Sequence, residues 1–278
     1  GNFGAMKNKG YEIDLGWNAI QKQDLNLNTT LNWSKNVNEV TDLYGTSVVN
    51  MSPGASVQSV ALVGSPLGTL FGTGSRTNPD GSFDLNSNGF PQITSSPIVL
   101  GDPNPDWRGG FSLSMRYKKL RLNAVLEHSE GGSFSPRTLW VLRRFGTTQE
   151  TANRITLDQS LVNYKGATIP AGTTVRGNIK DFGGGPVLLD ENWYRTGIGG
   201  GFGDNQAYNF SIADATFTKL RDLSLSYVID TPLVTNIGLS DVIVSLTGRD
   251  LININKVEGI DPETVSYTHL TLPTSDLV

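Results

Sequence analysis

The chain has 278 residues, of which 37% are hydrophobic and none is cysteine. The lack of cysteine excludes disulfides, thiolate metal sites and cysteine nucleophiles. With 22 basic and 26 acidic residues the formal net charge is -4. The sequence has no basic face of the kind that would suggest a nucleic-acid partner. No stretch approaches the roughly 18 apolar residues of a membrane-spanning helix, whereas a transmembrane β-strand needs only about 9–11 residues with alternate positions apolar. The composition therefore excludes a helical membrane protein and leaves a β-barrel open.

A β-hairpin is predicted near the start of the chain. Apolar residues occupy every second position from Tyr11 to Ala19 and again from Leu25 to Trp33, with polar residues between them. Successive side chains of a strand point to opposite faces, so each segment has one apolar and one polar face. The polar stretch 21–24 between them predicts a short turn.

The same alternation predicts two further hairpins. One joins 111–117 to 120–126 through a turn at 118–119, and the other joins 217–229 to 241–248 through a linker that contains a proline. Long stretches rich in Gly, Pro, Asn and Ser, roughly 35–108 and 128–216, separate the hairpins. Loops of this length are uncommon in compact soluble domains, but short turns and long extracellular loops are typical of transmembrane barrels.

Aromatic residues lie toward both ends of the predicted strands. Tyr11 and Trp17 flank the first strand, and Phe217 and Tyr227 flank the fifth. Such rings favour the two interfaces of a bilayer, although aromatic residues also favour strands in general. The placement is therefore consistent with two interfacial girdles and supports the barrel interpretation.

Five short motifs follow one another along the chain. They comprise Asn8, Gly10 and Glu12; Gly64, Gly68 and Gly72; Asp102, Asn104, Pro105 and Asp106; Phe217, Leu220, Leu223, Leu225 and Tyr227; and Gly259, Asp261, Pro262 and Glu263. The first resembles the Asn-x-Gly-x-Glu signature of TonB-dependent receptors, and the others are similar to ordered landmarks of the SusC/RagA branch of that family. The resemblance covers roughly residues 1–264.

The resemblance implies an all-β fold: an antiparallel transmembrane β-barrel of about 22 strands, of which this incomplete part would supply about six, with long extracellular loops. It also implies TonB-dependent import of oligosaccharides or peptides across a bacterial outer membrane. The expected partners are a SusD-like lipoprotein lid, the TonB complex acting on an N-terminal plug, and outer-membrane lipid. We expect residues 1–264 to be a C-terminal portion of such a barrel without its plug, and residues 265–278, which do not match the family's terminal strand, to be a non-native tail.

Two further signals are weaker. Asp84, Asn86 and Asn88 match the first half of a calcium loop, but a serine stands where a bidentate glutamate would complete the shell, which favours a solvated turn. Calcium is the one cofactor that the sequence suggests. Trp140, Trp193 and Tyr194 in the long loops could contact a sugar or a protein partner, or could pack in loop cores. The Gly-rich stretches 183–185 and 199–201 are interpreted as flexible loops.

Catalysis has little support in the sequence. His128 is followed by Ser129 and Glu130, but adjacency along a chain does not assemble a triad, so no enzyme is expected. Two other functions stay open: a soluble β-sandwich that binds carbohydrate, and a passive outer-membrane porin. A sandwich would bury the apolar strand face that a barrel presents to lipid, and a porin would conduct without TonB.

Overall fold

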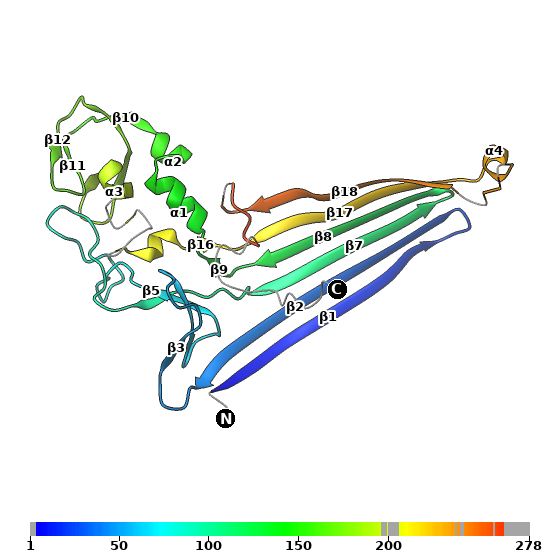
Figure 1. Cartoon of the computed structure of the whole chain (residues 1–278), viewed down its shortest axis with the longest axis horizontal. Coiled ribbons are helices and arrows are strands. Elements are labelled where there is room, and N and C mark those ends of the chain that lie inside the picture. Colours follow the sequence, from blue (N-terminus) through cyan, green and yellow to red (C-terminus); the bar gives the residue numbers. More distant parts are fainter. Residues whose placement is uncertain are drawn as a thin grey trace.

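The computed structural model describes residues 4–195, 199, 206–236, 238–239, 242–257 and 259–263. Its main feature is a six-stranded antiparallel sheet in which the strands lie in the order β1-β2-β7-β8-β17-β18 (Figure 1). Each long strand therefore pairs with the long strand that precedes or follows it along the chain. The six are β1 (Ala5–Gln21), β2 (Leu25–Asp42), β7 (Trp107–Tyr117), β8 (Leu120–Glu130), β17 (Phe217–Ile229) and β18 (Val242–Asn255).

Cross-strand pairing gathers the apolar side chains of all six strands on one face, here called the outer face. One row of direct neighbours is Leu15, Leu31, Phe111, Leu126, Leu220 and Ile252, and another is Ile20, Leu27, Met115, Leu122, Leu225 and Leu246. Leu246 is 77% exposed and Leu15 is 57% exposed. Soluble proteins rarely expose so continuous an apolar surface, so this face is built to contact lipid. The predicted alternation is confirmed.

The opposite, inner face of the sheet is polar. One row across it is Asn18, Asn28, Ser114, Asn123, Ser224 and Thr247. At one end this face is covered by the loops, because Asn38 accepts a hydrogen bond from the backbone N–H of Leu67 at 2.7 Å and Val40 packs against Leu43 and Ala61. The loops thus fold over the inner face.

The short turns lie at one end of the sheet and the long loops at the other (Figure 1). The predicted turns at 21–24 and 118–119 are confirmed, the first shortened to 22–24 because β1 includes Gln21, and the third connection contains the short helix α4 (Pro232–Thr235). Among the described residues every helix is too short or too polar to cross a membrane. β2 extends past the predicted strand as far as Asp42, where both faces are polar and no apolar alternation marks it.

A β-bulge changes the phase of alternation in β17. Leu220 pairs with Leu126 and Asp222 with Val125, which leaves Arg221 as an extra residue. Leu220 and Leu223 consequently share the outer face, although residues three positions apart would lie on opposite faces of a regular strand. Phe217 was predicted to flank the strand in an aromatic girdle, but the shifted phase places it on the inner face, where it is only 6% exposed. This part of the girdle prediction is wrong.

Both long insertions carry secondary structure of their own. The first, between β2 and β7, contains a four-stranded sheet of β3 (Val48–Asn50), β4 (Gln58–Leu62), β5 (Thr69–Gly72) and β6 (Ile98–Gly101). The second, between β8 and β17, contains β9 (Ser133–Phe134), α1 (Arg137–Arg144), α2 (Gln149–Ala152), β10 (Arg154–Thr156), β11 (Leu161–Val162), β12 (Thr168–Ile169), β13 (Thr174–Arg176), β14 (Asn178–Asp181), β15 (Pro186–Leu189), α3 (Glu191–Arg195), the 3-10 helix η1 (Tyr208–Ser211) and β16 (Ala213–Asp214).

The two insertions pack together into one loop body. Phe90 of the first insertion is fully buried among Phe182, Trp193 and Ala207 of the second, with ring centroids 5.5 Å apart between Phe90 and Trp193. The predicted flexible stretch at 183–185 is instead a hydrogen-bonded turn, because the Asp181 carboxylate accepts two backbone N–H groups there. Of the stretch 199–201, residues 200 and 201 lie outside the described residues.

We expect a charge on the outer face to destabilise the barrel far more than the same charge on the inner face. Leu31→Arg should lower the free energy of unfolding by about 2–4 kcal/mol, because it buries a charge in hydrocarbon. The matched control is Thr30→Arg, one residue away on the exposed inner face, which should change it little. The measurement is urea unfolding of the full-length protein from lipid vesicles; equal losses for both variants would contradict the assignment of faces.

Candidate functional site at the loop end of the inner face

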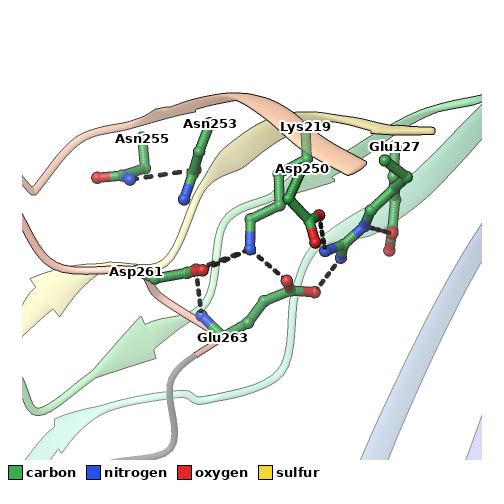
Figure 2. Close-up of polar contacts among 8 residues, drawn as sticks. Glu127, Lys219, Asp250, Asn253, Asn255, Asp261 and Glu263 are labelled. Carbon is green, nitrogen blue, oxygen red and sulfur yellow. Dashed lines mark hydrogen bonds and ion pairs between the residues drawn. The ribbon is translucent and has the colours of Figure 1, made fainter. Parts of the chain in front are cut away.

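An ion cluster lies on the inner face where the wall meets the loop body (Figure 2). The Lys219 side chain is 3% exposed, and its Nζ lies 2.8 Å from both carboxylate oxygens of Asp261 and also contacts Glu263. Arg221, the bulge residue, donates to Glu127 at 2.6 Å, to Asp250 at 3.3 Å and to Glu263. Two cations from β17 therefore hold together two neighbouring strands and the segment that follows β18.

The two carboxyls contributed by that segment are held in the charged form. Burial would raise the pKa of Asp261, but the hydrogen bond and charge of Lys219 outweigh it and hold that pKa below its ordinary value. Burial would also raise the pKa of Glu263, but the hydrogen bonds from Arg221 and Lys219 outweigh this effect and lower that pKa. Both groups are thus ionised at neutral and mildly acidic pH, and the contacts should weaken only as the pH falls through these lowered values.

Beside the ion cluster lies a pocket of about 570 Å³. Its floor comes from inner-face positions of the wall, and its sides come from both insertions and from the segment after β18. The lining includes Arg108, Ser129, Phe134, Arg137, Trp140, Phe217 and Glu263. A cavity of this size with apolar rings and a few charged groups fits the usual dimensions of a small-ligand site.

Arg108 gives the pocket an exposed positive charge. It lies on β7 opposite Ser34 and Ser129 on the inner face and is exposed. Within the described part of the chain no ion pair or hydrogen bond of its guanidinium is found. Glu263, which lines the same pocket, already contacts both cations of the ion cluster. Arginine presents a planar set of donors that suits a carboxylate, so the pocket can accept an acidic group.

The pocket is where several of the motifs meet. Pro105 from the third motif, Phe217 from the fourth motif, and Pro262 and Glu263 from the fifth motif all line it. Asp102 shapes the same corner: its carboxylate accepts hydrogen bonds from the backbone and side-chain nitrogens of Asn104.

The glycine motif supports that corner from the first insertion. Gly64 and Gly68 lie between β4 and β5, and Gly72 ends β5. Gly68 has a φ of +87°, and a side chain there would also lie 3.3 Å from Pro103, so the close approach favours glycine. The side-chain amide of Asn104 donates to the carbonyl of Leu67 at 3.3 Å and joins the two motifs.

Other motif residues lie away from the pocket. Asn8, Gly10 and Glu12 follow one another on the exposed inner face of β1, opposite β2. Leu220, Leu223, Leu225 and Tyr227 lie on the outer face. Asp106 and Gly259 flank the site without lining it. The strand residues among them build the wall, and none of these residues lines the pocket.

The loop aromatics are buried rather than presented to solvent. Trp140, Trp193 and Tyr194 are 3%, 4% and 5% exposed, and the Trp140 ring nitrogen donates to the carbonyl of Ser211 at 2.8 Å. The Tyr194 hydroxyl donates to Glu150 and accepts from Asn178; burial, reinforced by the Glu150 charge, raises its pKa. Packing in loop cores accounts for all three, and only Trp140 borders the pocket.

The residues of the weak calcium motif already have partners. Asp84 forms an ion pair with Arg76 at 2.5 Å and accepts from Gln92, and Asn86 accepts the backbone N–H groups of Asn88 and Phe90 in a tight turn. No group of three or more His, Cys, Asp or Glu side chains that could hold a metal ion occurs among the described residues. Calcium binding therefore stays a prediction without a preformed oxygen shell.

His128 and Ser129 point to opposite faces of the wall. His128 lies on the outer face, where its ring contacts Trp107 and its nitrogens lie 2.8 Å from the Thr218 hydroxyl and 3.1 Å from Glu130. Ser129 lies on the inner face and borders the pocket. The structure thus does not bring this pair together.

Sequence reasoning did not single out Arg108, Glu127, Lys219, Arg221 or Asp250 as site residues. The alternation places Arg108 and Glu127 on the polar face, and this signal was available. No local pattern announces that a segment more than 40 positions away would bring two carboxylates to Lys219.

We expect the ion cluster to hold the segment after β18 against the wall. Lys219→Met should detach this segment, because two carboxylates lose a buried cation. Amide hydrogen exchange at 259–263 of the full-length protein should then accelerate by on the order of tenfold, a modest figure because both carboxylates are about a third exposed. Lys256→Gln is the matched control, since it removes a neighbouring but solvent-exposed pair with Asp214. Equal acceleration in both variants would contradict the role of Lys219.

The chain is similar in sequence to known TonB-dependent receptors. The chain is 24% identical over 287 residues to TonB-dependent receptor P3 of Formosa agariphila and 23% identical over the same length to TonB-dependent receptor P26 of that organism; each alignment covers 94% of the chain. The chain spans about a quarter (26%) of the length of these curated relatives. No protein-family model matches it.

Solved structures show the same fold. A structure of the RagAB peptide transporter aligns with a TM-score of 0.57 at 20% identity, covering 93% of this chain and 27% of that one. The 'closed-closed' state of the RagAB peptide importer aligns with a TM-score of 0.58 at 21% identity. These matches confirm the resemblance carried by the motifs: the chain is similar in sequence to TonB-dependent receptors over 94% of its length and has the fold of part of the RagAB transporter.

Proposed function

We propose that this chain forms part of the wall and the extracellular loops of a TonB-dependent outer-membrane transporter. The observation that carries the proposal is the sheet itself, whose six strands expose a continuous apolar outer face and a polar inner face. Lipid accounts for the first face and a water-filled lumen for the second. The relatives are named as receptors and as a transporter, and an import function agrees with both names.

The sheet needs further strands to close in a membrane. β1 and β18 are its edge strands in the described chain. Each backbone group left unpaired in hydrocarbon costs several kcal/mol, so edges of this length would not persist there. We infer that strands of a longer receptor pair with both edges, in agreement with the quarter of the relatives' length that the chain spans.

A soluble β-sandwich is less well supported. It would require a second sheet packed on the apolar face. Over the described residues the buried apolar clusters lie in the loop body and at the loop end of the inner face, and none covers the outer face. A passive porin would have the same kind of wall. It differs from a TonB-dependent importer in that it conducts without energy from TonB.

The names of the relatives and the pocket together support a proposal for the substrate class. We propose oligosaccharides or peptides as substrates, delivered by a SusD-like lipoprotein that docks on the loop body. RagAB is described as a peptide transporter, which supports peptides as one of the two classes. The accessible Arg108 favours substrates that carry carboxylates within either class.

Uptake should depend on TonB and on the proton gradient. A strain that retains the intact receptor but lacks TonB, or that is treated with an uncoupler, should stop accumulating labelled substrate. Oligosaccharide and peptide mixtures supplied separately identify the class. Uptake that continues at the same rate in the absence of TonB would favour the porin.

We expect Arg108→Gln to lower uptake of acidic substrates by about tenfold or more, because a charged hydrogen bond contributes about 1.5–3 kcal/mol to binding. Neutral members of the same substrate class should be taken up as before. Arg154→Gln, on an exposed strand of the loop body, is the matched control. Equal losses for acidic and neutral substrates would show that Arg108 acts on the structure instead of on the ligand.

A further inference from the structure

Three lysines lie together on the outer face of the first hairpin, next to its loop end. Lys7 and Lys9 on β1 have the same orientation as Tyr11, and Lys35 on β2 is the direct cross-strand neighbour of Tyr11. Lys9 pairs with Val37, so Lys9 and Lys35 are diagonal neighbours with Cβ atoms within about 8 Å of each other. We call Lys7, Lys9 and Lys35 the lysine patch.

The lysine patch begins where the apolar band ends. The outer-face positions from Tyr11 to Trp17 and from Leu25 to Trp33 are apolar apart from Thr29, and the next outer positions are lysines. Lys9 and Lys35 are two residues beyond the rings of Tyr11 and Trp33, about 7 Å along a strand and about 5 Å in height at a tilt near 45°. The headgroup layer occupies roughly this height above the hydrocarbon.

The side chains of the lysine patch are exposed and available. All three residues are exposed, as are Tyr11 at 74% and Val37 at 58% between them. Glu39 is the cross-strand neighbour of Lys7, but among the described residues no ion pair of a patch lysine is formed. The loop body cannot cover them, because it folds over the inner face at Asn38 and Val40.

The other described strands lack such a patch. At the loop end, the outer face carries Trp107 on β7 and the contact pair His128 and Glu130 on β8. Lys256, beyond β18, forms an ion pair with Asp214. Among the six long strands as far as the structure describes them, positive charge without an ion-pair partner on this rim of the outer face therefore occurs only in the first hairpin.

We propose that the lysine patch binds the phosphate-bearing headgroups of lipids in the outward-facing leaflet of the outer membrane. Ammonium groups at headgroup height are attracted to anionic lipids, while Tyr11 and Trp33 anchor the hairpin at the hydrocarbon boundary. Two diagonal lysines can each contact one phosphate of the same headgroup or of adjacent lipids. The proposal rests on the proposed function in one respect, which is that the loop end faces outward.

The test uses the intact receptor purified in detergent, with lipid A, a phosphorylated disaccharide lipid, as the probe and native mass spectrometry as the readout. The variant Lys7→Gln, Lys9→Gln, Lys35→Gln should bind the probe at least about tenfold more weakly, since each basic residue near an anionic surface contributes roughly a fivefold factor. The variant with arginine at all three positions should retain binding.

A matched control removes three lysines elsewhere: Lys22→Gln, Lys165→Gln, Lys180→Gln, at the short-turn end and in the loop body. It should bind like the parent. Equal binding by the glutamine variant of the lysine patch and its parent, or equal binding of the dephosphorylated probe, would overturn the proposal. TonB-dependent uptake measured in parallel keeps the two proposals apart, because a receptor that fails to import but still binds the phosphorylated probe through the lysine patch contradicts only the function.

Discussion

Hydrogen bonding between the backbones of neighbouring long strands is the interaction on which the rest of this structure depends. Within hydrocarbon no water can satisfy a backbone N–H or C=O group, so the strands must pair without interruption across the apolar band. The resulting pleat sends alternate side chains to opposite sides. Rows such as the one from Leu15 to Ile252 are then set by pairing register alone, and so are the polar rows behind them. Both faces of the wall are thus consequences of one ladder of hydrogen bonds.

The departure from regular pairing at Arg221 coincides with the densest group of charges on the wall. The bulge directs Lys219, Arg221 and Asp222 to the inner face within four positions, where regular alternation would have sent one of the last two outward. Bulges are common beside functional sites because they redirect side chains. Here the redirected cations hold the segment after β18 next to the pocket. The position of that segment therefore depends on an irregularity of the wall.

The sequence was sufficient to predict the wall but not the site. The six strands, the turns at 22–24 and 118–119 and both faces could be predicted, because contact with lipid on one side and water on the other imposes period-two contrast. The same contrast disappears in β2 beyond residue 34, where the outer face carries Lys35 and Glu39 and the inner face is covered by the loops, so the extension to Asp42 could not be predicted. Phe217 was misplaced because a bulge leaves no local signature.

The motifs led to Phe217, Pro262 and Glu263 by resemblance, whereas their meeting with Lys219 depends on tertiary folding. Composition alone could not separate ligand contact from packing for Trp140, Trp193 and Tyr194.

The common core of the two insertions has an evolutionary consequence. Phe90 comes from one insertion and its aromatic neighbours come from the other, so neither half has a complete interior by itself. Recombination between related genes that replaced a single insertion would leave a cavity or a clash in that interior. The two insertions therefore form one inheritable module, and new surface properties on this side of the wall can be exchanged intact only when both travel together.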